Sequence, residues 1–188
     1  MRVHLLPASN ADSRKHYKDT ILNHSVNCKT EEIKKYVNKS ISDTLSEKSY
    51  ALWGVTNGGR NGLLNKNKWL KMQPNDIGFF YRDNKFYSSC LIHEKFHNKN
   101  YALQLWGEKY NKRLKIYETW ENMFLIKDLE ELNISIEVYN NLFGYDDGPL
   151  MAYKCLDEAE SENLLDAFHL ISNKNNKPKL KKMSPKNT

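Results

Sequence analysis

The chain has 188 residues, of which 39% are hydrophobic and 12% aromatic, a composition typical of one folded domain of ordinary size. No apolar run approaches the ~20 residues of a membrane span, and the apolar segment near the N-terminus is too short for a secretory signal. The three cysteines, Cys28, Cys90 and Cys155, are widely spaced and form no CxxC motif, which favours a reducing compartment over a disulfide framework. We therefore expect a cytoplasmic protein that binds no membrane.

The formal net charge of +6 invites a nucleic-acid interpretation, but its position in the chain matters first. Residues 172–188 contain six lysines and no acidic residue, so they account for the whole net charge and leave residues 1–171 neutral. The composition of this tail is typical of a disordered linker. We expect a folded domain over residues 1–171 and a basic flexible tail or linker over residues 172–188.

Inside the neutral part, basic residues gather in two clusters, each just downstream of a tryptophan. The first cluster follows Trp53 and the second follows Trp106. A solvated loop explains either cluster alone. Two clusters that each adjoin an aromatic residue favour a phosphate-binding surface. The candidate phosphate-binding residues are Arg60, Lys66, Lys68, Lys109, Lys112 and Arg113.

The first third of the chain predicts one strand and two helices. Residues 2–7 alternate enough for a strand that ends at Pro7. Residues 9–23 begin with capping side chains and favour a short helix. Residues 30–45 place apolar side chains on one helical face behind Thr30 as the N-cap, which predicts a second helix.

Strands dominate the middle of the chain. Short runs rich in aromatic and branched residues predict strands at residues 49–55, 76–82, 85–92, 101–107 and 122–129. The sequence RDNK, between the second and third of these, predicts a hairpin turn.

The last third predicts a short helix, a final strand and a terminal helix. Ser135 would cap the short helix and Gly144 would end it. Residues 148–156 would form the strand, and residues 157–172 the terminal helix. Together the elements predict an α+β fold with a curved mixed β-sheet or small barrel flanked by helices. Such barrels often carry binding sites at the open mouth.

Residues 93–97 read HEKFH and match the zinc-protease motif H-E-x-x-H. That motif binds zinc when its two histidines share a helical face, with the glutamate as general base. Here the preceding run alternates like a strand, the following residues are poor helix formers, and no third ligand stands at a suitable spacing. We favour a polar loop without metal; a zinc site on His93 and His97 is the alternative.

Other catalytic patterns are absent from the sequence. It contains no G-x-S-x-G, no P-loop and no G-x-G-x-x-G motif. Asp146 and Asp147 are adjacent, which favours a turn rather than a paired acid and base. We therefore expect a binding module with no cofactor and no enzymatic activity.

The segment YALWGVTNGGRNG, residues 50–62, ends a strand on Trp53 and continues as a glycine-rich loop. A base taken out of the stack needs aromatic faces and edge hydrogen bonds, and stacking contributes ~1–3 kcal/mol per base. Trp53 and Trp106 are candidates for opposing walls. Gly54 would let its backbone carbonyl approach a base edge. The alternative is that both rings are core residues.

The order of several segments resembles the YTH/EVE branch of the PUA-like superfamily, especially the N-terminal specificity domains of McrB-type modification-dependent restriction systems. The resemblance runs from about Val3 to Ile171. It rests on W-G after a strand, the strand D-I-x-F-F-Y and the later L-W-G. It implies a PUA-like fold and a reader of modified nucleic acid.

The resemblance also implies roles for individual residues. Trp53 and Trp106 would wall the methylated base, and Gly54 would accept from its exocyclic nitrogen. Ser9 and Asn10 in PASNADS would contact the base edge. A further asparagine of the YTH pattern is not present here, where the segment continues as ADSR.

The resulting hypothesis is a DNA-specificity module that flips a methylated base into an aromatic cage. N6-methyladenine is favoured and a modified cytosine comes next. The basic tail would connect the module to a motor or nuclease component of a restriction system. The alternatives are a methylated-RNA reader of the same fold, a protein-interaction domain, and the zinc protease.

Overall fold

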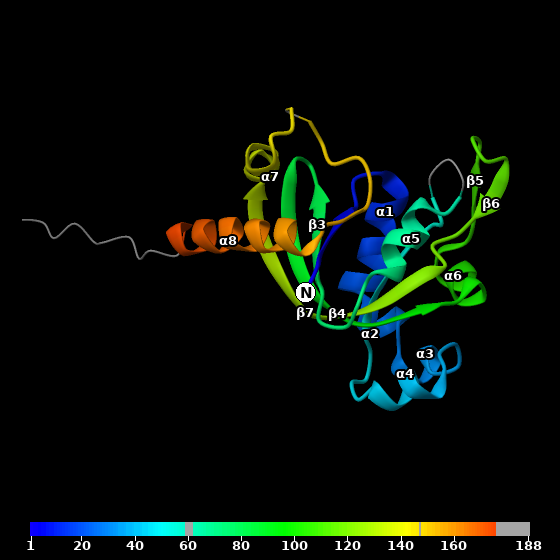
Figure 1. Ribbon diagram of the computed structural model, residues 1–188. Coiled ribbons are helices and arrows are strands. Elements are labelled where there is room, and N and C mark those ends of the chain that lie inside the picture. The colour runs from blue at the N-terminus through cyan, green and yellow to red at the C-terminus, as the bar shows by residue number, and fades with distance from the viewer. Residues whose placement is uncertain (59–61, 147, 176–188) are drawn as a thin grey trace, which may run out of the picture.

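A computed structural model of the chain describes residues 1–58, 62–146 and 148–175, the last six by their backbone alone. A six-stranded sheet in the order β2-β7-β4-β3-β1-β8 forms its centre and curls into a half-barrel (Figure 1). Of its neighbouring pairs, β1 and β3 are parallel and the others are antiparallel. The predicted α+β fold with a curved mixed sheet flanked by helices is confirmed.

Two of the strands are much longer than expected. β4 and β7 pair along most of their length, with register shifts that let the ladder bend. Asp83 and Asn84 have φ angles of 50° and 58° and form the predicted turn between β3 and β4. The strands of the sheet are β1 Val3–Pro7, β2 Ala51–Val55, β3 Ile77–Arg82, β4 Lys85–His97, β7 Asn122–Ser135 and β8 Lys154–Cys155. A separate hairpin consists of β5 Lys109–Asn111 and β6 Ile116–Glu118.

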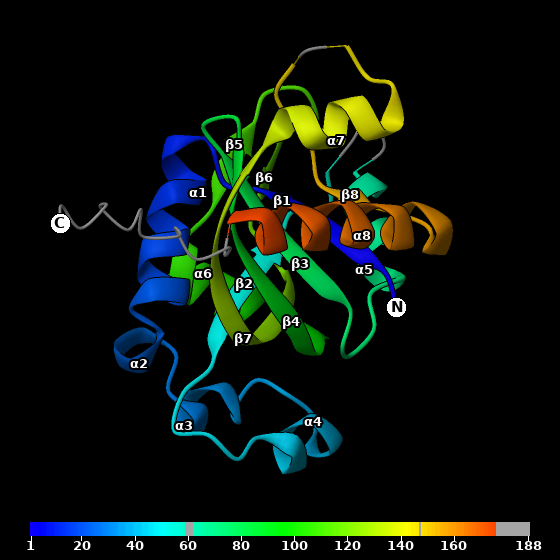
Figure 2. The ribbon, with the colours of Figure 1, turned by 90° about the vertical axis from the view of Figure 1, so that its left-hand side faces the viewer.

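Helices cover both faces of the sheet. α8 crosses one face, and α1 with the π-helical turn η1 lies beside the sheet on another side (Figure 2). Val3 and Leu5 of β1 pack in the cluster beneath α8, whereas Leu6 packs with Tyr17 of η1. The helical segments are α1 Ala11–His16, η1 Tyr17–Leu22, α2 His24–Asn27, α3 Thr30–Ile33, α4 Lys39–Thr44, α5 Leu64–Leu70, α6 Lys99–Trp106, α7 Ile136–Phe143 and α8 Glu158–Asn175.

Three further predicted elements differ from the sequence expectations. The single helix expected over residues 30–45 is broken into α3 and α4, because Asn38 starts a new helix by accepting from the Ile41 N–H at 2.9 Å. Residues 99–106 form α6 instead of a strand, with Asn98 accepting from the Tyr101 N–H at 2.9 Å as its N-cap. Only two residues of the strand expected over 148–156 pair with β1.

The two C-terminal helices follow their local signals. Ser135 caps α7, and Gly144 follows it in the left-handed conformation. Leu164 and Phe168 of α8 are buried. α8 continues to Asn175, past the expected domain boundary at residue 171, and residues 176–188 lie outside the described part of the chain.

None of the helices in the described part of the chain is both long enough and apolar enough to span a membrane.

Candidate functional site

A cavity of about 360 Å³ lies where the two ends of the curled sheet come together. The β2 end contributes residues 53–56, and the β1–β8 end contributes Leu6, Pro7 and Tyr153. We call this cavity the seam pocket. Its remaining lining residues are Asn10, Ser13, Leu64, Asn65, Trp120, Met151 and Ala152.

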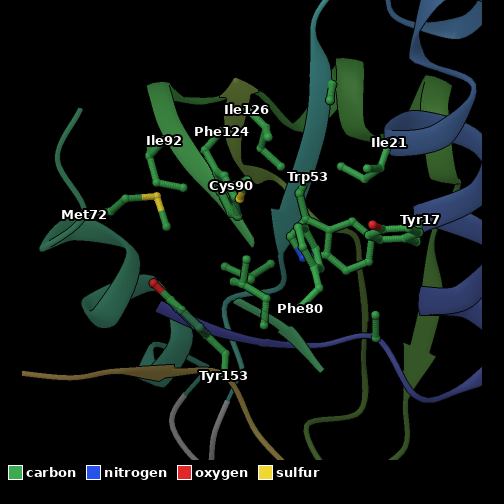
Figure 3. Packing of buried hydrophobic residues seen from close by; sticks show 14 of the residues in the cluster. Tyr17, Ile21, Trp53, Met72, Phe80, Cys90, Ile92, Phe124, Ile126 and Tyr153 are labelled. Carbon is green, nitrogen blue, oxygen red and sulfur yellow. The ribbon is translucent and has the colours of Figure 1, made fainter. Parts of the chain in front are cut away.

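Trp53 forms the inner wall of the seam pocket and belongs to the core as well. Its side chain is only 3% exposed. The ring packs edge-to-face against Phe80 at 5.2 Å and Tyr17 at 6.2 Å between centroids (Figure 3). A ligand in the pocket would therefore contact only an edge of the Trp53 indole, which the core already holds in place.

Trp106 lies on the other side of β2. Successive side chains of a strand point to opposite faces, so the Trp53 side chain and the Gly54 position face different ways. A Cβ built on Gly54 would stand 2.8 Å from Cζ3 of Trp106, and Trp106 does not line the seam pocket. The structure does not bring Trp53 and Trp106 together as opposing walls, which corrects the predicted pairing.

Trp120 occupies the wall that was expected of Trp106. It is half-buried and lines the seam pocket just before β7, the strand that pairs with β2. A Cβ at Gly54 would stand 2.3 Å from the Trp120 carbonyl oxygen, so only glycine allows this close approach. Trp120 was not among the site residues expected from the sequence. The sequence feature that could have indicated its place in the pocket wall is an aromatic residue just before β7, the strand that pairs with the W-G strand β2.

His16 supports both indoles from behind. Its ring stacks on Trp106 at 5.5 Å and meets Trp120 edge-to-face at 4.2 Å. Burial against these rings lowers the pKa of His16 to about 4, so the imidazole is neutral at neutral pH. The aromatic wall therefore gains no charge from this histidine.

Of the predicted pair Ser9 and Asn10, only Asn10 lines the seam pocket. Its Oδ1 accepts from the Ser13 N–H at 2.8 Å and so caps α1. This cap holds the amide in one orientation at the pocket wall. Ser9 is exposed beside it, and its hydroxyl donates to the Tyr81 carbonyl at 3.5 Å.

A network of amide side chains, which was not expected from the sequence, fixes the loop after β2. Asn122 is fully buried and donates through Nδ2 to the Val55 carbonyl at 3.1 Å and to Asn57 Oδ1 at 2.8 Å. Asn57 in turn donates to Glu121 Oε1 at 2.8 Å. Thr56 is thereby held at the pocket wall between two anchored residues.

Tyr153 is the fixed wall at the opposite end of the sheet. Its hydroxyl lies 2.9 Å from Nδ1 of the buried His4, whose Nε2 lies 3.2 Å from Asp76 Oδ2. Lys68 donates to the Tyr153 carbonyl at 2.6 Å. Burial alone would raise the pKa of Asp76, but hydrogen bonds from His4 and two backbone N–H groups outweigh it and lower the pKa.

The fold has relatives among solved structures. No protein-family model and no curated protein matches the sequence. The N-terminal domain of Thermococcus gammatolerans McrB, solved bound to m5C DNA, matches with a TM-score of 0.61 and 16% identity, over 91% of this chain and 99% of that domain. This chain has the McrB N-terminal domain fold.

Two further structures match at lower scores. The MmI1 YTH domain has a TM-score of 0.46 and 9% identity, over 93% of this chain and 99% of its own. A ZmASCH protein of Zymomonas mobilis has a TM-score of 0.45 and 8% identity, over 87% and 94%. The match to the McrB domain confirms the McrB-like fold expected from the sequence.

Within the McrB-like fold, the predicted basic residues have different surroundings. Lys66 is half-buried on α5, and Lys68 is tied to the Tyr153 carbonyl. Lys109 pairs with Asp12 of α1, which links the β5–β6 hairpin to the helix beside the seam pocket. Lys112 and Arg113 are exposed at the turn of that hairpin, and Arg60 lies outside the described residues.

The HEKFH segment lies within β4, so the polar loop expected there is strand instead. Two histidines four residues apart in a strand are about 13 Å apart along it, too far to share one zinc ion. The His93 ring stacks on Tyr50 at 5.0 Å, and His97 Nε2 lies 3.3 Å from Glu121 Oε1. Among the described residues, no group of three potential metal ligands is found.

Proposed function

We propose that this chain is a recognition module for modified DNA and that the seam pocket receives a base flipped out of the duplex. The observation that carries the proposal is one cavity lined by the half-buried Trp120, by the buried Trp53 and by Asn10, whose amide caps α1. Its volume of about 360 Å³ lies within the range of ~300–1,000 Å³ of small-molecule sites. The shared fold with a McrB domain solved on m5C DNA supports DNA as the ligand.

Recognition in this pocket would combine stacking with edge hydrogen bonds. Flipping costs a few kcal/mol, and stacking on aromatic side chains returns ~1–3 kcal/mol per base. The polar side chains at the wall are those of Asn10, Ser13, Thr56 and Asn65. Because Asn10 is held as a helix cap, it meets the base edge without first losing rotational freedom.

The cations beside the pocket would hold the DNA backbone. Lys112 and Arg113 at the hairpin turn and Lys66 on α5 are the most available of the predicted phosphate ligands. Contacts of this kind position the duplex and carry no base specificity. In this proposal the chain performs no chemistry itself and targets a motor or nuclease component of a restriction system.

A binding panel tests the proposal. Three duplexes that differ at one base would be compared: one with N6-methyladenine, one with m5C and one without modification. The sequence resemblance favours N6-methyladenine, and the DNA bound to the McrB domain carries m5C. We expect a modified duplex to bind more tightly than the unmodified one. Equal affinity for all three would contradict the proposal. Tighter binding to single-stranded RNA with the same modification would identify the chain as an RNA reader. Absence of binding to both DNA and RNA would favour a protein-interaction domain.

A further inference from the structure

Met151 is the most exposed large apolar side chain in the described part of the chain, with 82% of its surface accessible. It also lines the rim of the seam pocket. A single exposed apolar side chain is common on a protein surface, but apolar side chains gathered at the rim of a pocket mark a contact with its ligand. The position of Met151 at this rim, rather than its exposure alone, indicates a contact with the ligand of the pocket.

The backbone on both sides holds Met151 outward. Leu150 is 6% exposed and packs in the cluster beneath α8. Tyr153 is 5% exposed, and its hydroxyl and carbonyl are held by His4 and Lys68. Two buried anchors three residues apart leave Met151 projecting at a defined place on the rim.

Leu64 is a second exposed apolar residue at the same rim. It is the first residue of α5, lines the seam pocket and is 52% exposed. The mouth of the pocket thus presents two exposed apolar side chains, while amides and indoles line its walls. Cations of α5 stand close to this mouth, and Lys68 lies 5.9 Å from the Tyr153 ring centroid. The exposed apolar side chains at the mouth would fit the stacked bases inside a duplex. The lysines of α5 beside them would fit its phosphates.

We infer that Met151 enters the base stack at the step from which the flipped base departs, with Leu64 packing beside it. This inference rests on the proposed function, because only a flipped base leaves such a gap. Methionine and leucine are among the apolar wedges that proteins insert between base steps. The unbranched thioether of methionine adapts to an irregular gap. The wedge would lower the cost of flipping without contacting the modified base itself.

The test compares Met151→Ala, Met151→Leu and the control Val26→Ala on two ligands, a modified duplex and a single strand with the same modified base. Val26 is 70% exposed on α2 and does not line the pocket. We expect Met151→Ala to weaken duplex binding about tenfold, equivalent to about 1.4 kcal/mol. Its single-strand affinity should stay unchanged, because a single strand has no gap to fill. Met151→Leu should restore most of the duplex affinity, and Val26→Ala should change neither.

Three outcomes separate the wedge from the pocket. If Met151→Ala weakens both ligands equally, Met151 contacts the base and the wedge is wrong. If it weakens neither, the wedge is also wrong. If the unaltered protein shows no preference for the modified base on either ligand, the proposed function fails instead. Because Met151 is exposed, the unfolding midpoint of Met151→Ala should match that of the unaltered protein.

Discussion

The seam pocket and the groove beneath α8 show how one sheet produces two cavities of opposite chemistry. The groove is larger, about 600 Å³ against about 360 Å³, and Phe79 and Phe168 contribute to its apolar lining. Its polar lining includes the carboxylates of Asp128, Glu130 and Asp166. These negative charges would repel DNA phosphates, so the larger cavity is the poorer candidate for a nucleic-acid site.

Adjacent residues of β3 serve the two regions. Phe79 lines the groove, whereas Phe80 packs against Trp53 behind the seam pocket. The alternation of a strand thus supplies both surfaces from consecutive positions. The difference between them teaches that the charge and polarity of the lining, rather than cavity size, identify the nucleic-acid side of this molecule.

The largest expected effect separates the two indoles of the seam pocket. Trp53→Ala removes a buried ring from the core and should lower the free energy of unfolding by about 3–5 kcal/mol. Trp120→Ala removes a half-buried ring and should cost much less. Urea denaturation of the two variants measures this difference. Equal losses would show that Trp120 is as much a core residue as Trp53.

A pH titration tests the neutral wall behind the pocket. The pKa of His16 is lowered to about 4 in the folded protein, so the unfolded chain binds the proton more readily. The contribution of neutral His16 to the free energy of unfolding is fully present above about pH 6.5. It is lost as the pH falls towards 4, and the loss amounts to up to about 3 kcal/mol. His16→Phe should therefore flatten the dependence of unfolding free energy on pH across this window. An unchanged profile would mean that His16 is not buried as described.

Binding energies sharpen the contrast between the two sides of β2. Trp120→Ala should weaken binding of a modified duplex by about 1–3 kcal/mol, because the base loses a stacking partner. Trp106→Ala should keep the discrimination between modified and unmodified duplexes, because Trp106 does not line the pocket. Fluorescence anisotropy on both duplexes measures the two effects. Loss of discrimination only in Trp106→Ala would restore the pairing first expected from the sequence.

The smallest effect contrasts the charges of the two regions. Lys112→Gln should lower the slope of log affinity against log salt by about 0.9, with no change in base preference. Glu130→Gln, in the groove beneath α8, serves as the matched control and should leave the slope unchanged. Binding measured at several salt concentrations gives both slopes. A larger effect from Glu130→Gln would place the DNA on the groove side.

Local sequence signals predicted most elements in those segments whose pattern was compatible with only one type of secondary structure. Ser135 and Gly144 predicted both ends of α7, and the RDNK turn predicted the β3–β4 hairpin. The run YALQLWG fits both strand alternation and a short helix, and the Asn98 cap with tertiary packing made it helical. The helix expected over residues 30–45 failed for a similar reason, because Asn38 offered a second cap within an apolar pattern that looked continuous.

Only part of the candidate site could be predicted from the sequence. Trp53, Gly54 and Asn10 were expected from the chain and do line one pocket. Trp120, Tyr153 and Met151 were not expected there, since each comes from a distant segment. No spacing in the sequence relates these segments.

The amino-acid sequence by itself determined most strands of the main sheet, the β3–β4 turn and both ends of α7, because these depend on neighbours within a few residues. Only the tertiary structure decided which tryptophan stands opposite Trp53. The curl of the sheet brings the β2 end to the β1–β8 end, and strand alternation turns Gly54 towards Trp106 while Trp120 closes the seam. Both depend on long-range strand pairing, which no single segment encodes.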